Sequence, residues 1–264
     1  MYHRVAESSA DPLELCVAPS RFAEHLAVLE SVGEIVPLRE LLSERRGSGL
    51  SCALTFDDGY ADNALEAAPL LAQHDAHATV FVVAGAVGSS RAFWWDRLAG
   101  LLYRDGDSSE YWSAWERLRR LPVPEAEEEL ASLERQRGLG ATDGARPVSE
   151  AELESLASGP IEIGGHTVTH PSLPVLGLDE QEREIADGRG RLEELVGRPL
   201  EAFSYPYGDY DDATVRLVQQ TGFRFACSVE EGFVSRDSSP FLLPRYAVRD
   251  WPADELERRL ATWA

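Results

Sequence analysis

Two adjacent aspartates that follow an apolar segment are the sharpest chemical signal in the sequence. The run Thr55-Phe56-Asp57-Asp58-Gly59-Tyr60 places both carboxylates at the end of a predicted short strand, residues 51–56. Neighbouring carboxylates there are unfavourable unless a cation or a proton-transfer role uses them. Functional sites also gather at the carboxyl ends of strands in α/β proteins. An Asp-Asp-Gly turn leading into a helix would explain the same residues equally well.

Two histidines four residues apart give a second signal. In His166-Thr167-Val168-Thr169-His170 the spacing predicts that both imidazoles lie on one face of a short helical turn, where they can bind one metal ion. Gly164 and Gly165 allow a sharp bend before this turn, and Pro171 disfavours helical geometry at its end. A lone histidine is more often structural, whereas this pair after a strand favours a metal site.

The elements that must position these residues alternate along the chain. Strands are predicted at 51–56, 78–83, 161–163, 202–204 and 223–229, and helices at 62–73, 178–195 and 212–221. This alternation predicts βαβ units and a mainly parallel sheet. By itself it allows an open sheet as well as a barrel.

The alternation stops between Ala84 and Pro160. This stretch carries Phe93-Trp94-Trp95, Tyr111-Trp112 and Trp115, followed by an acidic run. We expect a Trp-rich, mostly helical insertion at about 86–150 within a single domain, 1–264, and we expect it to shape a substrate groove.

Composition excludes several classes of protein. The 264 residues are 44% hydrophobic and 27% charged, which is typical of a soluble globular protein rather than a disordered one. The formal net charge of -21 argues against a nucleic-acid partner, because phosphate backbones need basic patches. No apolar stretch approaches the roughly 18 residues of a membrane span. With no signal peptide in the sequence as written, we expect a cytoplasmic protein, or an extracytoplasmic one if a leader has been trimmed.

Three motifs in order resemble the polysaccharide deacetylases that carry the rhizobial chitooligosaccharide-deacetylase domain. They are Thr55 to Gly59, His166 to His170, and the Pro-aromatic-Gly turn within Tyr205-Pro206-Tyr207-Gly208. The resemblance runs from about Tyr2 to Arg245 and implies a distorted (β/α) barrel of about seven parallel strands, with the site at the strand ends.

The resemblance also implies roles for individual residues. Asp58, His166 and His170 would bind a divalent metal, most simply Zn²⁺, with Co²⁺, Ni²⁺ or Fe²⁺ as alternatives. Asp57 would be the general base, and the backbone N–H of Tyr207 would bind the oxyanion. The reaction implied is removal of an N-acyl group, most simply N-acetyl, from an amino sugar or N-acetylated saccharide.

The general acid is less apparent, because no histidine follows His170. The poly-N-acetylglucosamine deacetylases, a branch of the family, have an early Tyr-His pair, and Tyr2-His3 matches it. We therefore expect His3 to protonate the leaving amine, although a surface histidine near a frayed terminus is the simpler alternative.

Arg245, in Leu243-Pro244-Arg245, resembles the arginine of the same branch and replaces the one that many members have at the position of Ser204. We expect it to pair with Asp57 and orient it. A surface salt bridge is the alternative.

Four further residues are candidates for substrate binding. Trp94 and Trp95 offer aromatic faces for sugar rings, although large aromatic residues are more often core. Tyr60 and Asn63 lie beside the aspartates, with helix capping as the alternative for Asn63.

Other functions remain open at this stage. The same site could deformylate a lipid-linked amino sugar or open a cyclic amide. A non-catalytic saccharide-binding protein would be expected to lack the base or a ligand, and this sequence retains both. A magnesium phosphatase of the Asp-x-Asp type fits less well, because magnesium prefers oxygen ligands to imidazoles.

Overall fold

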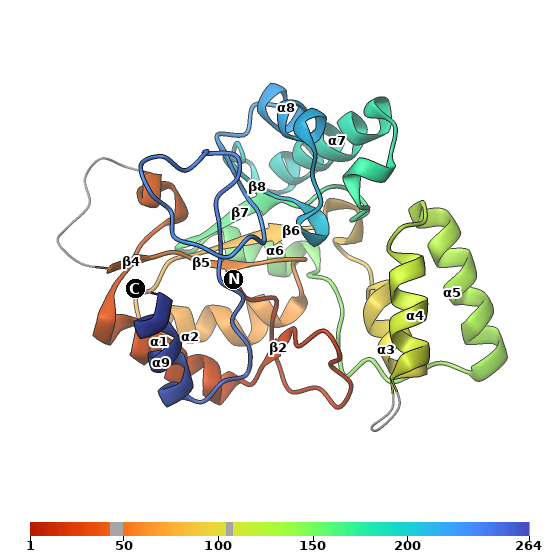
Figure 1. The fold of residues 1–264 in the computed structure, drawn as a ribbon, viewed down its shortest axis with the longest axis horizontal. Coiled ribbons are helices and arrows are strands. Elements are labelled where there is room, and N and C mark those ends of the chain that lie inside the picture. The colour runs from red at the N-terminus through yellow and green to blue at the C-terminus, as the bar shows by residue number, and fades with distance from the viewer. Residues whose placement is uncertain (43–49, 104–107, 264) are drawn as a thin grey trace.

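A curled parallel sheet forms the centre of the protein (Figure 1). The computed structural model describes residues 1–42, 50–103 and 108–263, and its main sheet has the strand order β5-β6-β7-β8-β9. These strands span Leu54–Phe56, Ala78–Val82, Ile161–Gly165, Ala202–Ser204 and Phe225–Cys227. Almost every strand residue is buried, which is why these segments are continuously apolar rather than alternating.

The register brings the two chemical motifs to one edge of the sheet. Leu54 lies opposite Ala78, which lies opposite Ile161, so β5 and β7 run level on either side of β6. Because all three strands are parallel, the residues that follow β5 and β7 emerge at the same end. The sheet therefore places Asp57 and His166 near one another.

The architecture confirms the predicted distorted barrel, but the expected count of about seven strands is wrong. Within the described ranges the main sheet has five strands. At one edge Tyr2 forms a single parallel bridge with Phe56, and at the other Leu243 forms one with Cys227. These two edge segments are too irregular to count as strands. Beyond Leu243, the backbone N–H of Arg245 donates to the carbonyl oxygen of Glu230 (2.8 Å) and not to Ser228, so the regular pairing with β9 does not continue.

Met1 joins the two edge segments. Its amino group donates to the carbonyl oxygen of Tyr246 (2.8 Å), and its own carbonyl accepts from the N–H of Val248 (2.9 Å). These bonds bring the start of the described chain beside the segment that follows Leu243. The curled sheet is thereby extended into a distorted barrel.

Helices cover the outside of the sheet (Figure 1). Helices α7 and α8 pack together, as do α1 and α9. The helices around the barrel are α1 Pro19–Val32, α2 Ala68–Gln73, α6 Glu150–Ala157, α7 Leu178–Val196, α8 Asp212–Gln220 and α9 Ala253–Trp263. The helix expected at 62–73 begins as a π-helical turn, Asn63–Ala67, and continues as α2.

Two small parallel sheets flank the barrel. Strand β1 (Arg4–Val5) pairs with β2 (Cys16–Val17), and β3 (Gly33–Ile35) pairs with β4 (Leu50–Cys52). The single strand expected at 51–56 is therefore divided, because β4 and β5 belong to different sheets.

Three helices between β6 and α6 stand beside the barrel (Figure 1). They are α3 Trp94–Leu102, α4 Ser109–Leu118 and α5 Val123–Arg137. Their apolar faces form a cluster of their own, which includes Trp95, Leu98, Tyr111 and Leu130. Tyr60, from the barrel, is buried in the same cluster, so these helices are packed directly against the β5 end.

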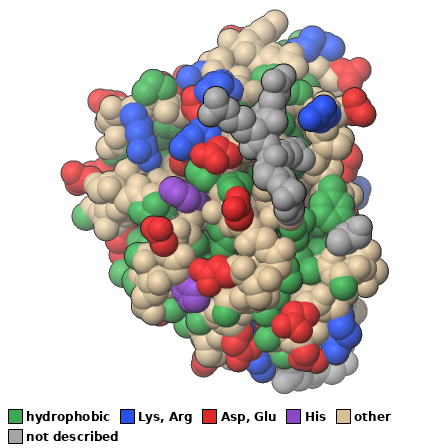
Figure 2. All heavy atoms as spheres, turned by 90° about the vertical axis from the view of Figure 1, so that its left-hand side faces the viewer, with side chains coloured by type: hydrophobic (Ala, Val, Ile, Leu, Met, Phe, Trp, Pro, Cys, Tyr) green, Lys and Arg blue, Asp and Glu red, His purple; other side chains and the backbone are tan. Residues whose placement is uncertain are grey.

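The face turned away from these three helices carries acidic side chains interspersed with arginines (Figure 2). The excess of acidic residues over the whole chain gives the net charge of -21. Across the described helices, none combines the length and the apolarity that crossing a membrane requires.

Candidate active site

The two aspartates lie buried where β5 ends. Asp57 still belongs to the ladder, since its N–H donates to the carbonyl oxygen of Tyr2 (3.0 Å). Asp58 then adopts a left-handed backbone with φ of 73°. Gly59 follows at φ 74°, and a Cβ there would lie 3.0 Å from a methyl carbon of Val82, so the turn has room only for glycine. The chain reverses within two residues, and the two carboxylates have different partners.

The loop after β7 carries the two histidines, but it is not the helical turn that the spacing predicts. Thr167 and His170 both have left-handed backbones, with φ of 65° and 61°. The hydroxyl of Thr167 accepts from the N–H of His170 (2.9 Å), closing the loop locally. Left-handed residues other than glycine are unfavourable unless their surroundings hold them. The imidazoles converge because of this irregular loop rather than because of helical periodicity.

Glu184, on α7, is the main external support of that loop. Its carboxylate accepts from the N–H groups of Val168 (2.9 Å) and Thr169 (2.8 Å) and from the Thr169 hydroxyl (2.7 Å). One helical turn further on, Gly188 lies so close that a Cβ would be 3.0 Å from the Thr167 carbonyl carbon. Sequence reasoning missed Glu184, because nothing in an amphipathic helix indicates which of its many acids faces a loop.

Asp58, His166 and His170 form a compact set of candidate metal ligands. Asp58 Oδ1 lies 3.4 Å from His166 Nε2 and 3.3 Å from His170 Nε2, and the two Nε2 atoms are 3.1 Å apart. Two tetrahedral ligands that are each about 2.0–2.1 Å from zinc are themselves about 3.3–3.4 Å apart. The spacing of these atoms therefore fits a common ion.

The protonation of His166 also fits a metal ligand. Its Nδ1 lies 2.7 Å from the carbonyl oxygen of Ser204. A carbonyl can only accept, so Nδ1 carries a proton, and Nε2 is the ring nitrogen that faces Asp58 and His170. In the part of the chain that the structure describes, this is the one group of three or more His, Cys, Asp or Glu side chains with metal-ligand spacing.

His170 packs on aromatic rings, and within the described ranges Nε2 is its only ring nitrogen with polar side-chain partners. Its buried Nδ1 has no partner among the described residues. The ring lies against Trp95 (4.7 Å between centroids) and Tyr207 (4.5 Å). Burial lowers the pKa of His170, although its hydrogen bond to Asp58 opposes this effect. A lowered pKa favours the neutral imidazole that metal binding requires.

Asp58 is ionised despite its burial. Burial acts to raise the pKa of its carboxyl, but the hydrogen bonds of His166 and His170 outweigh that effect and hold the pKa well below its usual range. An anionic oxygen facing two imidazole nitrogens suits a divalent cation that accepts mixed nitrogen and oxygen ligands.

Asp57 belongs to a second, buried network. Arg245 donates to both of its carboxylate oxygens, at 2.7 and 2.8 Å. Ser204 donates to the same carboxylate (3.2 Å) and accepts from Arg245 (2.9 Å). Burial alone would raise the pKa of Asp57, but Arg245 outweighs it and lowers the pKa to about 2. Sequence reasoning missed Ser204 as a member of this network.

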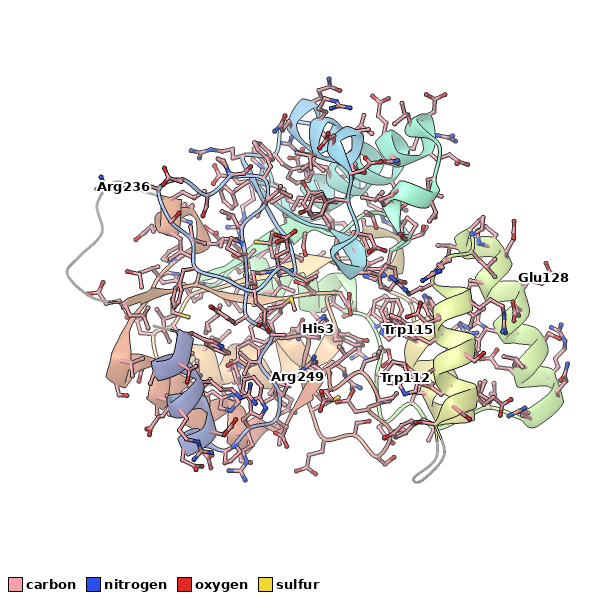
Figure 3. The ribbon with its side chains drawn as sticks, in the orientation of Figure 1. His3, Trp112, Trp115, Glu128, Arg236 and Arg249 are labelled. Carbon is pink, nitrogen blue, oxygen red and sulfur yellow. The ribbon has the colours of Figure 1, made fainter. Side chains whose placement is uncertain are left out.

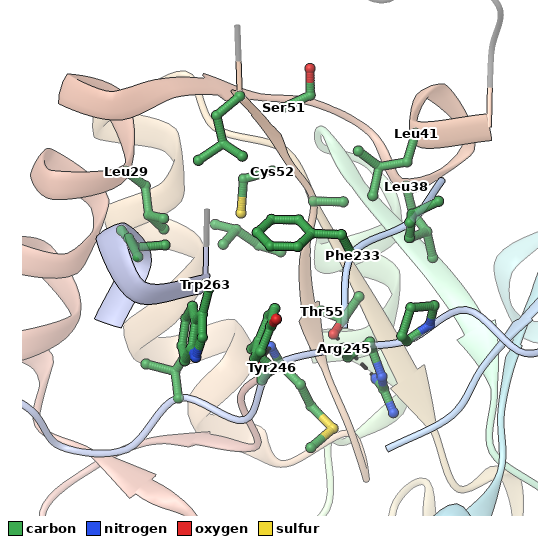
Figure 4. Close-up of a pocket in the computed structure, with 18 of the residues that line it drawn as sticks. Leu29, Leu38, Leu41, Ser51, Cys52, Thr55, Phe233, Arg245, Tyr246 and Trp263 are labelled. Atoms are coloured by element: carbon green, nitrogen blue, oxygen red, sulfur yellow. Dashed lines mark hydrogen bonds between the residues drawn. The ribbon is translucent and has the colours of Figure 1, made fainter. Parts of the chain in front are cut away.

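Apolar surroundings strengthen this ion pair from behind (Figure 4). Arg245 and Thr55 line a second cavity of about 240 Å³, whose wall includes Leu38, Phe233 and Trp263. Arg245 also donates to the Thr55 hydroxyl (3.2 Å), and its guanidinium lies 5.6 Å from the centre of the Phe81 ring. Because both side chains are less than 10% exposed, the charge–charge attraction is weakly screened.

Except for Arg245, which lines the cavity behind Asp57, the catalytic candidates share one cavity of about 410 Å³. Its lining includes His3, Asp57, Asp58, Trp95 and Tyr207, together with Trp115 on α4. His3 comes from the barrel and Trp115 from the helices beside it, as Figure 3 shows. Burial lowers the pKa of His3, while the charges of Asp58 and Asp57 oppose this. The cavity thus combines the candidate metal ligands, a second carboxylate and an imidazole with aromatic walls.

Tyr60 and Asn63 do not line this cavity. The hydroxyl of Tyr60 accepts from the Trp95 indole (2.7 Å) and donates to Asp96 (2.9 Å), whose pKa is raised to about 7 by burial. The amide of Asn63 donates to the backbone carbonyl of His3 (2.8 Å). Both side chains support cavity residues from behind.

Trp94 and Trp95 differ in their surroundings. Trp95 lines the cavity and packs on His170, whereas the indole of Trp94 donates to the hydroxyl of Tyr207 (3.3 Å) from outside it. Both are less than 10% exposed. Sequence reasoning did not single out Trp115 as a cavity residue, since large aromatic residues are typical of cores as well.

The fold and the site are those of an α/β-barrel protein with a candidate metal centre, and sequence comparison identifies its family. The model of the polysaccharide deacetylase family matches residues 45–226, which is most of the chain. The chain therefore belongs to the polysaccharide deacetylase family.

Individual relatives agree with this assignment. YxkH of Bacillus subtilis (strain 168), which carries the name of a polysaccharide deacetylase, is 22% identical over 253 residues, covering 94% of this chain and 70% of the relative. Two solved structures share the fold. The Streptococcus pyogenes deacetylase PplD in complex with acetate has a TM-score of 0.69 at 20% identity, covering 100% of this chain and 96% of that one. IcaB from Ammonifex degensii has a TM-score of 0.69 at 21% identity, covering 99% and 94%.

Proposed function

We propose that this protein is a metal-dependent hydrolase that removes an N-acetyl group from an amino sugar or an N-acetylated saccharide. Membership of the deacetylase family supports deacetylation. One observation supports the proposed metal dependence. The ligand atoms of Asp58, His166 and His170 lie within 4.8 Å of one another, next to Asp57, which is paired with Arg245.

The ligand set suits zinc best, with Co²⁺, Ni²⁺ or Fe²⁺ as alternatives. Two imidazoles and one carboxylate leave an open position in a tetrahedral site, as catalytic zinc sites do. When bound, a divalent cation there would lower the pKa of a water molecule and stabilise negative charge on the substrate's carbonyl oxygen.

The protein's own residues divide the remaining work. Asp57 takes the proton of the attacking water, because its low pKa keeps it ionised and Arg245 fixes its orientation. The backbone N–H of Tyr207 donates to the carbonyl oxygen as charge develops there. His3, which lines the same cavity, donates a proton to the leaving nitrogen.

The cavity walls favour a saccharide. Trp95, Trp115 and Tyr207 present aromatic surface in the cavity that contains the ligands. Sugar rings pack well on such faces through their C–H groups. Tyr60 and Asn63 act in this proposal as supports for Trp95 and His3, and Trp94 as a support for Tyr207, rather than as contacts to the substrate.

The test is release of acetate from N-acetylglucosamine oligomers and polymers, with and without a chelator and added Zn²⁺ or Co²⁺. We expect release that a chelator abolishes and metal restores. Release of formate from N-formyl sugars instead of acetate would favour the deformylase alternative. No acyl release from any substrate, with no effect of chelator, would contradict the proposal.

Two variants separate binding from chemistry. Asp57→Asn should retain metal but lose most turnover, because the ligands remain while the base is lost. His166→Ala should lose both, because it removes a ligand. Metal content by elemental analysis and acetate release, measured on the same preparations, check both expectations; unchanged activity in either variant would remove that residue's role.

A further inference from the structure

The turn that carries Tyr207 has an unfavourable backbone and needs outside support. Tyr207 is left-handed, with φ of 59° and ψ of 1°. Gly208 follows at φ 73°, and a Cβ there would lie 2.2 Å from a methyl carbon of Val229. A bulky residue in the left-handed region persists only when surrounding contacts hold it. The contacts around Tyr207 therefore identify the residues that hold this turn in place.

Most of the ring contacts of Tyr207 come from the helices beside the barrel. Its hydroxyl accepts from Trp94 on α3 (3.3 Å). Trp95 and Trp115 meet the ring edge-on, each with a centroid distance of 6.4 Å. The guanidinium of Arg119, the residue after α4, lies 5.8 Å from the centre of the same ring. The helices beside the barrel thus hold the Tyr207 side chain in place.

Arg119 also contacts the residue that follows the turn, Asp209, and so restrains the backbone of the turn. It donates to Asp209 Oδ2 (3.2 Å), and Asp209 directly follows the turn, with its N–H bonded to the carbonyl of Pro206 (3.0 Å). The same Oδ2 accepts from the hydroxyl of Ser172 (2.7 Å), two residues after His170. One carboxylate oxygen therefore joins α4, the Tyr207 turn and the metal-ligand loop.

We infer that Arg119 is a positioning residue, which holds the Tyr207 turn where its backbone N–H can meet the substrate's carbonyl oxygen. We call the contacts of Arg119 with Tyr207 and Asp209 the clamp. The expected effect on turnover rests on the proposed function, whereas the existence of the clamp does not. Exposed ion pairs contribute little on their own. Arg119 differs because its guanidinium also lies over two aromatic rings, 5.1 Å from the centre of Trp115 and 5.8 Å from that of Tyr207.

Arg119→Ala, Arg119→Lys and Arg120→Ala form a matched set of variants. Arg120 is the neighbouring residue, has a more exposed side chain, and pairs with Glu116 rather than with Asp209. Lysine keeps a charge for Asp209 but lacks the broad guanidinium that lies over Trp115 and Tyr207. The set separates the clamp from a general loss of positive charge beside the cavity.

The first measurement is amide hydrogen exchange in residues 205–211, which requires neither substrate nor activity. The amide of Gly208 is bonded to the Tyr205 carbonyl (2.9 Å), so it reports on opening of the turn. We expect Arg119→Ala to speed this exchange on the order of tenfold or more, Arg119→Lys to give an intermediate effect and Arg120→Ala none. Exchange in β6 should not change, which excludes global unfolding. Wild-type exchange in Arg119→Ala would overturn the inference.

The second measurement is steady-state kinetics with bound metal quantified. Arg119→Ala should lower kcat on the order of tenfold to a hundredfold while leaving KM and metal content near wild type, because the donor is displaced but the ligands are not. Faster exchange with an unchanged kcat would overturn the positioning role. If the wild-type protein releases no acetate, the proposed function fails, and the exchange experiment still decides whether the clamp exists.

Discussion

Arg245 holds Asp57 through two parallel hydrogen bonds, of 2.7 and 2.8 Å, although 188 positions separate the two residues in the sequence. Both side chains are buried. The pair fixes the orientation of Asp57 relative to Asp58, its neighbour in the chain, which faces the histidines. Two adjacent carboxylates thereby have distinct electrostatic surroundings and distinct proposed roles.

Removing Arg245 should destabilise the fold as well as slow the reaction. Arg245→Ala leaves Asp57 buried without its cationic partner, and breaking such a pair costs about 3–5 kcal/mol. Arg245→Lys should restore part of that stability but little turnover, because an ammonium cannot form the two parallel bonds. Urea unfolding and kcat, measured on both variants, check this.

Arg224→Ala is a suitable control for that experiment. Arg224 pairs with Glu201 on the surface, with 68% of its side chain exposed. Its loss should cost less than about 1 kcal/mol. If Arg245→Ala unfolds at the same urea concentration as this control, the buried pair does not contribute as described.

Glu184 should control metal affinity without touching the metal. In Glu184→Ala the loop 166–170 loses three hydrogen bonds, so its left-handed residues are less well held. Loss of groups that orient metal ligands typically lowers affinity about 10–100-fold. Competition with a chromophoric chelator measures this. Glu182→Ala, an exposed acid on the same helix, should bind metal like the wild type, and equal affinities in the two variants would contradict the supporting role.

The pH dependence of turnover should reveal His3. Burial lowers its pKa below the ordinary value of about 6.5, so the protonated form that an acid requires is lost as pH rises through that lowered pKa. Asp57, with a pKa of about 2, stays ionised near neutral pH and therefore does not change the rate with pH there. We therefore expect kcat/KM to fall towards alkaline pH between about pH 5 and 9.

His3→Gln supplies the check on that assignment. Glutamine fills similar space but does not titrate, so the variant should be slow and its pH profile should lose the alkaline limb. The profiles are measured with saturating metal, so that loss of the ion does not imitate titration. A variant with the wild-type rate and profile would mean that the acid lies elsewhere.

Local sequence patterns predicted much of the barrel but not its edges. Buried parallel strands read as continuous apolar runs, so β5, β6 and β7 were recognisable. The segments at Tyr2 and Leu243 pair through one bridge each, and their place in the barrel depends on bonds between distant parts of the chain. The count of about seven strands, which the family resemblance implied, was wrong because among the described residues these edge segments form single bridges rather than strands.

The histidine motif shows where reasoning from spacing fails. The four-residue interval suggested a helical turn, yet Thr167 and His170 are left-handed. Glu184 lies 16 positions after Val168 and on another element, so the spacing of residues within the motif could not predict its hydrogen bonds to the loop. Tyr60 and Asn63 were candidates for substrate contact because they are neighbours of the aspartates in sequence, but the chain turns there and their side chains support Trp95 and His3.

The sequence by itself determined which chemical groups are present and roughly where strands deliver them, since residue types, apolar runs and motif order are local properties. It therefore predicted Asp57, Asp58, His166 and His170 as the candidate centre. Only the tertiary structure decided how these groups are held, through Arg245 on Asp57, the Ser204 carbonyl on His166 and Arg119 beside the Tyr207 turn. Those contacts join residues far apart in the chain, and their geometry exists only after the barrel and its neighbouring helices have packed together.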